Sequence, residues 1–198
     1  SCYTVENTEL VDINSMRHRR EKIRFSKMQS CGNDYIFIEN FDGRISCPES
    51  LCVTLCAPHY GIGADGIVLI EGSETANAKM RSFNRDGSEG KMAGNNIRCV
   101  AKYLYDNGLV KSESMAIEAA DGVHSLKLSV RAGKVSSVTV DMGAPTMQAE
   151  SLPMLGVNGE AKNISLTVGG TDYSVSCVSV GNPHCVVFVE DAFGFDID

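Results

Sequence analysis

Short apolar segments separated by glycine-centred turns occupy most of this chain and limit the folds open to it. Only two stretches carry helical signals. One follows Ser46, where a capping box with proline in the first turn predicts a helix through about residue 56. The other covers residues 95–107, with apolar positions at helical spacing and Gly108 as the C-terminal cap. Strands therefore dominate, and the sequence predicts an α+β fold. The expected strands are residues 23–28, 35–38, 67–70, 78–84, 114–119, 125–130, 135–141, 164–168, 173–180 and 186–189.

A weak internal echo suggests two related halves. Gly32-Asn33 and Gly181-Asn182 are each followed by an apolar strand and then by an acidic and amide end. A chance match over so few positions is the alternative. If the echo is real, the chain is a duplication whose second unit is cut short and exposes apolar strand surface. The expected divisions are a disordered extension or leader at 1–22, a first unit at 23–140 and a partial second unit at 141–198.

Composition excludes several classes of protein. The net charge of −7 argues against nucleic acid as a partner. No apolar stretch has the length of a membrane span or the form of a signal peptide. The eight cysteines are interpreted as reduced thiols. We therefore expect a cytoplasmic protein with no membrane contact.

Two patterns resemble cofactor sites but have better structural explanations. Cys52 and Cys56 lie near Cys47 and His59, yet their spacing is not that of a structural zinc site, and they are expected to be buried. Residues 61–66 read Gly-Ile-Gly-Ala-Asp-Gly, but a helix precedes them and a strand follows, the reverse of a dinucleotide fingerprint. A tight turn or a close backbone approach is expected instead, with no cofactor and no metal.

The most informative stretch is residues 83–99, in which a polar turn leads to a Gly-Asn pair at a helix start. A helix N-terminus presents free N–H groups and partial positive charge, so it can bind a carboxylate. Asn84 and Asn95 can add neutral donors and acceptors. The alternative is that Asn95 only caps the helix.

These residues resemble the diaminopimelate epimerase pattern Cys-Gly-Asn-x-x-Arg-Cys, and three further motifs match in order. Phe25-Ser26-Lys27-Met28 leads into Gly32-Asn33-Asp34, residues 61–65 resemble the second glycine-rich turn of the family, and residues 181–184 resemble its Gly-Asn-Pro-His motif. The similarity covers about residues 23–198. It implies two similar units, each a curved mixed or antiparallel sheet around a central helix, with the site between them.

The resemblance also implies a mechanism. Members of the family invert the α-carbon of an amino acid without pyridoxal phosphate or metal, one cysteine removing the α-proton and a second returning one. In this chain Ala93 occupies the position of the first cysteine, and the second belongs to a segment expected beyond Asp198. We therefore expect an inactive chain. Cys99 lies too far along the helix to replace the base, whereas Cys31, beside the Gly32-Asn33 turn, stays open as a replacement.

The site residues follow from the same resemblance. His184 is expected to tune the pKa of a catalytic thiol, or else only to shape the turn after Pro183. Gly66 stands where many relatives carry a glutamine, and Glu89 and Arg98 are expected to have structural roles. The residues expected to line the substrate site are Asn33, Asn84, Gly94, Asn95 and Asn182.

Three functions remain open at this point. The first is a diaminopimelate epimerase (LL to meso, for lysine and cell-wall precursors), inactive in this form. The second is a pyridoxal-phosphate-independent racemase of another amino acid, and the third is a non-catalytic amino-acid-binding relative. Each predicts a small-molecule amino acid as the partner and allows a homodimer.

Overall fold

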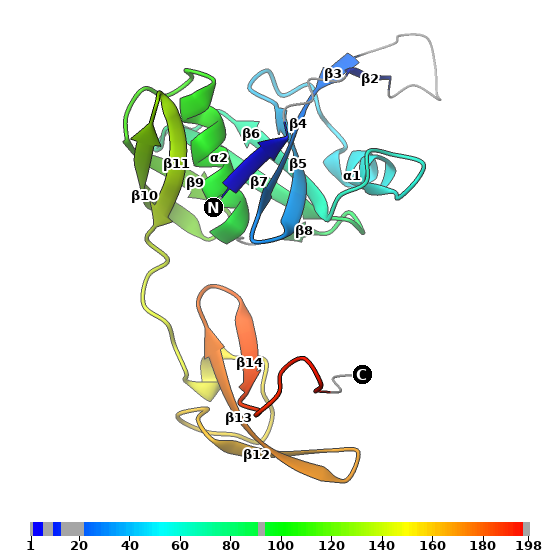
Figure 1. Ribbon diagram of the computed structural model, residues 1–198, viewed down its shortest axis with the longest axis vertical. Coiled ribbons are helices and arrows are strands. Elements are labelled where there is room, and N and C mark those ends of the chain that lie inside the picture. Colours follow the sequence, from blue (N-terminus) through cyan, green and yellow to red (C-terminus); the bar gives the residue numbers. More distant parts are fainter. Residues whose placement is uncertain (1, 6–9, 13–21, 91–93, 196–198) are drawn as a thin grey trace. The chain divides into compact units, whose positions relative to one another are not determined.

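The chain divides into two compact units, Ser1–Asp141 and Met142–Asp198. The structure is a computed structural model that describes residues 2–5, 10–12, 22–90 and 94–195. Figure 1 shows the elements of each unit. No helix in these described segments is long and apolar enough to cross a membrane.

A large mixed sheet forms the first unit, in the order β1-β4-β5-β6-β7-β9-β10-β11, with the short β8 paired to β7. The β5–β6 and β7–β9 pairs are parallel and the others antiparallel. The bounds are β1 Cys2–Val5, β4 Ser26–Ser30, β5 Asn33–Glu39, β6 Gly66–Glu71, β7 Ala78–Asn84, β8 Glu89–Gly90, β9 Ser114–Ala119, β10 Gly122–Arg131 and β11 Lys134–Val140.

Side-chain alternation along the central strands produces two cores, one on each face of the sheet. In β5, Tyr35 and Phe37 face the core around α2 (Gly94–Asp106), and Ile36 and Ile38 face the core beside α1 (Pro48–Cys56). All four side chains are buried. The period of two in the sequence therefore separates the two helices onto opposite faces.

Helix α2 is the centre around which the sheet curls. It contacts β4 and β5 at one side of the sheet and β9, β10 and β11 at the other, and Figure 1 shows it between β11 and β4. The helix ends in a Schellman motif, because Leu109 N–H donates to Leu104 C=O and Gly108 N–H to Tyr105 C=O. Gly108 has a φ of 72°, which confirms the predicted cap. The curved mixed sheet around a central helix confirms the α+β fold expected from the sequence.

Helix α1 forms where the sequence predicted a helix, but its capping is different. The N-cap is Cys47, and no side chain caps the helix start, so the predicted capping box is wrong. Ser46 hydroxyl instead contacts Cys47 sulfur at 3.9 Å. Pro48 at the first helical position needs no hydrogen-bond partner for its nitrogen, which leaves fewer groups to cap.

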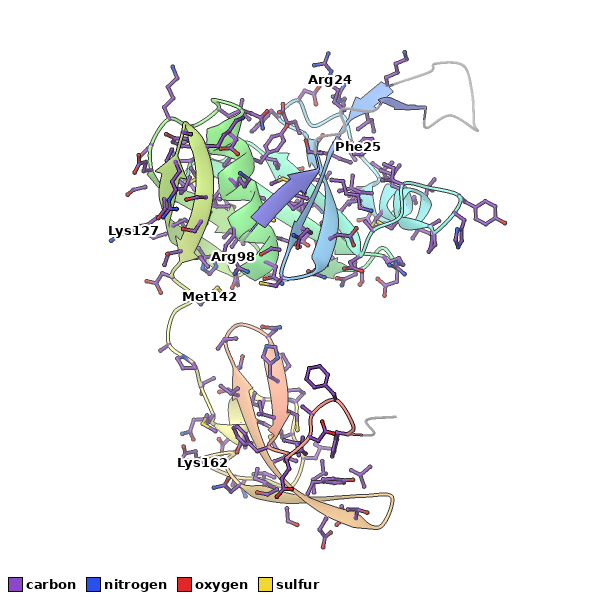
Figure 2. All side chains as sticks on the ribbon, viewed as in Figure 1. Arg24, Phe25, Arg98, Lys127, Met142 and Lys162 are labelled. Atoms are coloured by element: carbon purple, nitrogen blue, oxygen red, sulfur yellow. The ribbon has the colours of Figure 1, made fainter. Side chains whose placement is uncertain are left out.

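Strands also occur in the first 22 residues, for which a disordered extension was predicted. β1 pairs with β4 at an edge of the large sheet, and β2 (Leu10–Asp12) pairs with β3 (Lys22–Arg24). The expected strand at 23–28 is therefore divided into β3 and β4 around Phe25, which Figure 2 labels.

The second unit contains a three-stranded antiparallel sheet and a small core. Its strands are β12 (Ile164–Val168), β13 (Thr171–Ser179) and β14 (Pro183–Val187). Its described residues form no α-helix, only a short 3₁₀ turn at Ala149–Ser151. Phe188, which follows β14, is 89% exposed. The residues of its core are Ala149, Leu152, Ala161, Val175 and Cys177.

Candidate functional site

The ends of three central strands, β5, β6 and β7, lie side by side and bring separate motifs together. The edge of the sheet meant from here on is this one, along which strands begin and end. Tyr35 pairs with Gly66, and Gly66 pairs with Asn84. The starts of β5 and β6 and the end of β7 therefore lie side by side. Asn33, Asp65 and Asn84 are consequently neighbours in space, although the first and the last are 51 residues apart along the chain.

A tight two-residue turn carries the first Gly-Asn motif between β4 and β5. Cys31 and Gly32 have φ values of 57° and 81°, and Ser30 pairs with Asn33. Two successive residues with positive φ form the turn type that matches strand twist. The glycine adopts this conformation without strain, whereas Cys31 is held in it by the hairpin. The turn fixes Asn33 at the first position of β5.

Asp65 is the centre of the hydrogen bonds at this edge. Its Oδ2 accepts from Asn33 Nδ2 at 2.9 Å and from Asp34 N–H at 3.1 Å. Its Oδ1 lies 3.4 Å from an Arg85 guanidinium nitrogen. Arg85 N–H also donates to Asp65 C=O at 2.9 Å. A single carboxylate therefore connects the Gly-Asn turn, the glycine-rich turn and the segment after β7.

Asn84 closes a compact turn of its own. Its Nδ2 donates to Ser88 Oγ at 3.0 Å, and its backbone N–H donates to Ser88 C=O at 2.8 Å. Its own carbonyl accepts from Cys52 sulfur, 2.9 Å away on α1. The amide groups of Asn33 and Asn84 thus both have partners within the protein.

The start of α2 is tied to the same edge by Arg98, which Figure 2 labels on the helix. The guanidinium nitrogen Nη2 donates to Asn95 Oδ1 and to Ser30 Oγ, the latter at 3.0 Å, and lies 3.8 Å from Cys31 sulfur. Gly94 and Asn95 are half-buried. Since the first turn contains no acidic side chain, the partial positive charge of the helix start is not neutralised from within the helix.

Behind the site, a buried polar chain fixes the helix to the sheet. Asn96 Nδ2 donates to Ser82 Oγ at 2.9 Å, and both residues are buried. Burial raises the pKa of Tyr35, although its hydrogen bond with Asn96 opposes that shift. This keeps the Tyr35 hydroxyl neutral and able to donate.

Gly66 has no room for a side chain. A Cβ added there would lie 2.1 Å from Phe83 C=O and 2.4 Å from Tyr35 Cε1. A close backbone approach was one of the two roles predicted for these glycines, and Gly66 confirms it. Gly63 has a φ of 75° and takes the other role, the tight turn.

The paired thiols on α1 are structural. Cys52 and Cys56 are fully buried with their sulfurs 3.8 Å apart, which confirms the expected burial. The hydrogen bond with Cys52, together with burial, raises the pKa of the Cys56 thiol. Among the described residues, no group of three or more His, Cys, Asp or Glu side chains has the arrangement of a metal site.

The remaining predicted site residues divide between the second unit and an undescribed segment. Asn182 lies in the turn between β13 and β14, and His184 lies on β14 opposite Val178. Both are exposed. His184 contributes with Leu152 and Met154 to a pocket of about 230 Å³ in the second unit. Ala93 lies outside the described residues.

Sequence reasoning did not assign the connecting residues. Asp65 was recognised only as part of a glycine-rich motif, and Arg98 only as a residue with a structural role. Lys27, which donates to Gly63 C=O at 2.6 Å and pairs with Asp34 at 2.8 Å, was named only as part of the motif at residues 25–28. The sequence feature that could have pointed to these residues is a charged side chain inside or near a glycine-containing turn.

Comparison with known proteins identifies relatives over most of the chain. The family model described as diaminopimelate epimerase matches residues 25–148, more than half of the 198 residues. A diaminopimelate epimerase of Pelotomaculum thermopropionicum is 45% identical over 85% of this chain and 61% of the relative. That of Agathobacter rectalis is 39% identical over 89% of this chain and 64% of the relative. The chain thus spans less than two thirds of the length of these relatives.

Solved structures share the fold at low sequence identity. A hydroxyproline epimerase from Agrobacterium vitis is 14% identical with a TM-score of 0.61, covering 82% of this chain and 50% of that one. A probable proline racemase from Agrobacterium radiobacter is also 14% identical with a TM-score of 0.62, covering 83% and 51%. These matches support the fold, and the sequence matches establish the family. The chain belongs to the diaminopimelate epimerase family.

Proposed function

We propose that this chain contains the substrate-binding half-site of an epimerase that interconverts LL- and meso-diaminopimelate by proton transfer between two thiols. The observation that carries the proposal is the meeting of the Gly32-Asn33 turn, Asp65 and the α2 start, joined through Arg98, in a member of this family. The reaction would supply precursors for lysine and the cell wall. No cofactor is required by this mechanism.

The α2 start would bind the α-carboxylate of the substrate. Backbone N–H groups at a helix N-terminus and its partial positive charge favour an anion. Because Asn95 Oδ1 accepts from Arg98, Nδ2 is the side-chain group of Asn95 that would donate to the substrate. A donor-rich pocket of this kind also stabilises negative charge that develops at the α-carbon.

The chain would bind substrate without turning it over. Proton abstraction requires a group that can ionise, and Ala93 offers only a methyl group at the position of the first cysteine. Cys31 is exposed and lies 3.8 Å from Arg98 Nη2, so it is the alternative base at this edge. His184 would tune the pKa of a catalytic thiol, and Asn182 would line the substrate site.

Two alternatives share the same fold. Ala93 favours a non-catalytic amino-acid-binding relative, because a regulatory protein needs the carboxylate site but no base. A racemase of another amino acid would keep the same α-carbon contacts and differ at the distal end of the substrate.

Titration calorimetry with meso-diaminopimelate tests the proposed binding site. We expect binding by the chain as it stands and at least roughly tenfold weaker binding by Asn95→Ala, which loses a donor next to the carboxylate. Asn107→Ala, beyond the other end of α2, is the matched control and should bind like the parent. Equal affinity of the parent and Asn95→Ala would contradict the proposed site. Binding of proline or histidine in preference to diaminopimelate would favour the second alternative.

A further inference from the structure

Two cysteines oppose each other across neighbouring strands of the second unit. Cys177 on β13 pairs in register with Cys185 on β14. Cys177 N–H donates to Ala161 C=O at 2.8 Å, and Ser179 exchanges backbone hydrogen bonds with Thr146. These bonds point away from β14. Cys177 and Cys185 therefore form a non-hydrogen-bonded pair, in which the Cα atoms are about 4.5 Å apart and both side chains lie on one face.

That separation is within the range compatible with a disulfide. The two thiols differ in their access to solvent, since Cys185 is exposed and Cys177 is only 8% exposed. Burial and a hydrogen bond with Cys185 raise the pKa of the Cys177 thiol. An external reagent therefore meets Cys185 first, and Cys177 is positioned directly behind it.

We propose that Cys177 and Cys185 form a modification site, a dithiol that a low-molecular-weight disulfide such as oxidised glutathione converts to an intrachain disulfide. The Cys185 thiolate attacks one sulfur of the reagent, whose S–S bond breaks and releases one thiol. The Cys177 thiol then loses its proton to solvent and attacks the Cys185 sulfur, releasing the second thiol. The protein dithiol loses two electrons, and the reagent is reduced to two thiols.

The buried pair on α1 shows why proximity alone is insufficient. Cys52 and Cys56 sulfurs are 3.8 Å apart, yet both side chains are fully buried and Cys52 sulfur is engaged by Asn84 C=O. No reagent reaches either thiol in the folded unit. An intrachain disulfide is therefore expected at Cys177–Cys185 and not at Cys52–Cys56, independently of any activity at the α2 start.

The cross-link would act on the segment that carries the second Gly-Asn motif. The turn between Ser179 and Pro183 contains Gly181-Asn182, and Cys177 and Cys185 are the next pair on the same face of the ladder. A covalent bond there would fix β14 and its His184 against β13. It would also occupy part of the pocket that Cys177 and Cys185 line.

Peptide mass spectrometry after incubation in glutathione buffers tests the site directly. Residues 163–198 contain no Lys or Arg and only two cysteines, Cys177 and Cys185, so one tryptic fragment reports on the pair. After alkylation we expect this fragment to lack both alkyl groups and two hydrogen atoms, while Cys52 and Cys56 are alkylated once the chain is denatured. Half-oxidation should need at least about tenfold less oxidised glutathione in the folded chain than in urea.

Two variants separate the steps. Cys177→Ser should stop at a mixed disulfide with one glutathione on Cys185, and Cys185→Ser should leave Cys177 reduced. Circular dichroism should give the same spectrum for both variants and the parent. A folded parent that retains glutathione on Cys185 beside a free Cys177 would overturn the proposal. So would equal oxidation of the folded and unfolded chains.

Discussion

Arg98 donates through its guanidinium to the side chain of Asn95, one turn earlier on α2. The same nitrogen reaches Ser30 at the end of β4, so the helix start and the β4–β5 hairpin are connected by one cation. The family motif at this helix therefore fixes the position of the Gly32-Asn33 turn as well as that of the helix start.

Replacing Arg98 by Met should separate these elements. We expect a loss of about 1–2 kcal/mol in the free energy of unfolding, because two hydrogen bonds from a charged group disappear at a partly buried site. Urea unfolding followed by circular dichroism measures the change. Arg131→Met, at an exposed position at the end of β10, is the control and should change the stability little. A similar loss in both variants would show that the bridge contributes nothing.

Asp65→Ala should be more costly than Arg98→Met, because the Asp65 carboxylate has three partners from two separate segments. We predict a loss of about 1–3 kcal/mol, since Asn33 Nδ2 and Asp34 N–H would lose their acceptor. Asp42→Ala removes an exposed ion pair with Arg44 and should cost under about 0.5 kcal/mol. If the two variants unfold at the same urea concentration, Asp65 does not hold this edge together.

Gly66→Ala tests the close approach of three strands. Its Cβ would overlap the Phe83 carbonyl and the Tyr35 ring, so we expect a loss of at least about 2–3 kcal/mol. Gly72→Ala has open space around it and should be neutral or slightly stabilising. A stable Gly66→Ala protein would show that β5 and β7 separate easily enough to admit a side chain here.

The stability of the first unit should fall at alkaline pH because of Tyr103. Burial, and then its hydrogen bond to Glu39 at 2.6 Å, raise the pKa of this phenol. Above about pH 10 the Tyr103 phenol therefore keeps its proton in the folded state, whereas in the unfolded chain its pKa is about 10 and it releases the proton. The resulting stability is fully present below about pH 10 and decreases as the pH rises above it. Tyr103→Phe should show a smaller decrease, measured as the difference between the two urea midpoints from pH 8 to 11. Parallel curves would contradict this assignment.

Local signals predicted the elements well. Apolar alternation predicted β7, β9 and β12 with their observed bounds, and Gly108 marked the end of α2. Both Gly-Asn pairs of the internal echo lie at hairpin turns, one where β5 begins and one just before β14. These features depend on neighbouring residues, which is why one sequence suffices to find them.

Long-range contacts were harder to predict. The 32-residue separation of Asn33 and Asp65 and the 68-residue separation of Ser30 and Arg98 leave no trace in local patterns. The capping box failed for a related reason, because helix α1 begins one residue later, at Pro48, than the box required. The start of α1 is thus set by Pro48, whose backbone nitrogen cannot donate a hydrogen bond, rather than by side chains that could cap the helix.

The most direct test of the proposed chemistry is exchange of the substrate α-proton with solvent. Ala93→Cys would be introduced into this chain joined to the part of the Pelotomaculum relative that it does not cover, and LL-diaminopimelate would be followed by proton NMR in deuterium oxide. We predict that the α-proton signal disappears with Ala93→Cys and persists with Ala93, because only the thiolate accepts the proton. Exchange by the Ala93 form, or no exchange by Ala93→Cys under conditions in which it binds the substrate, would contradict the account.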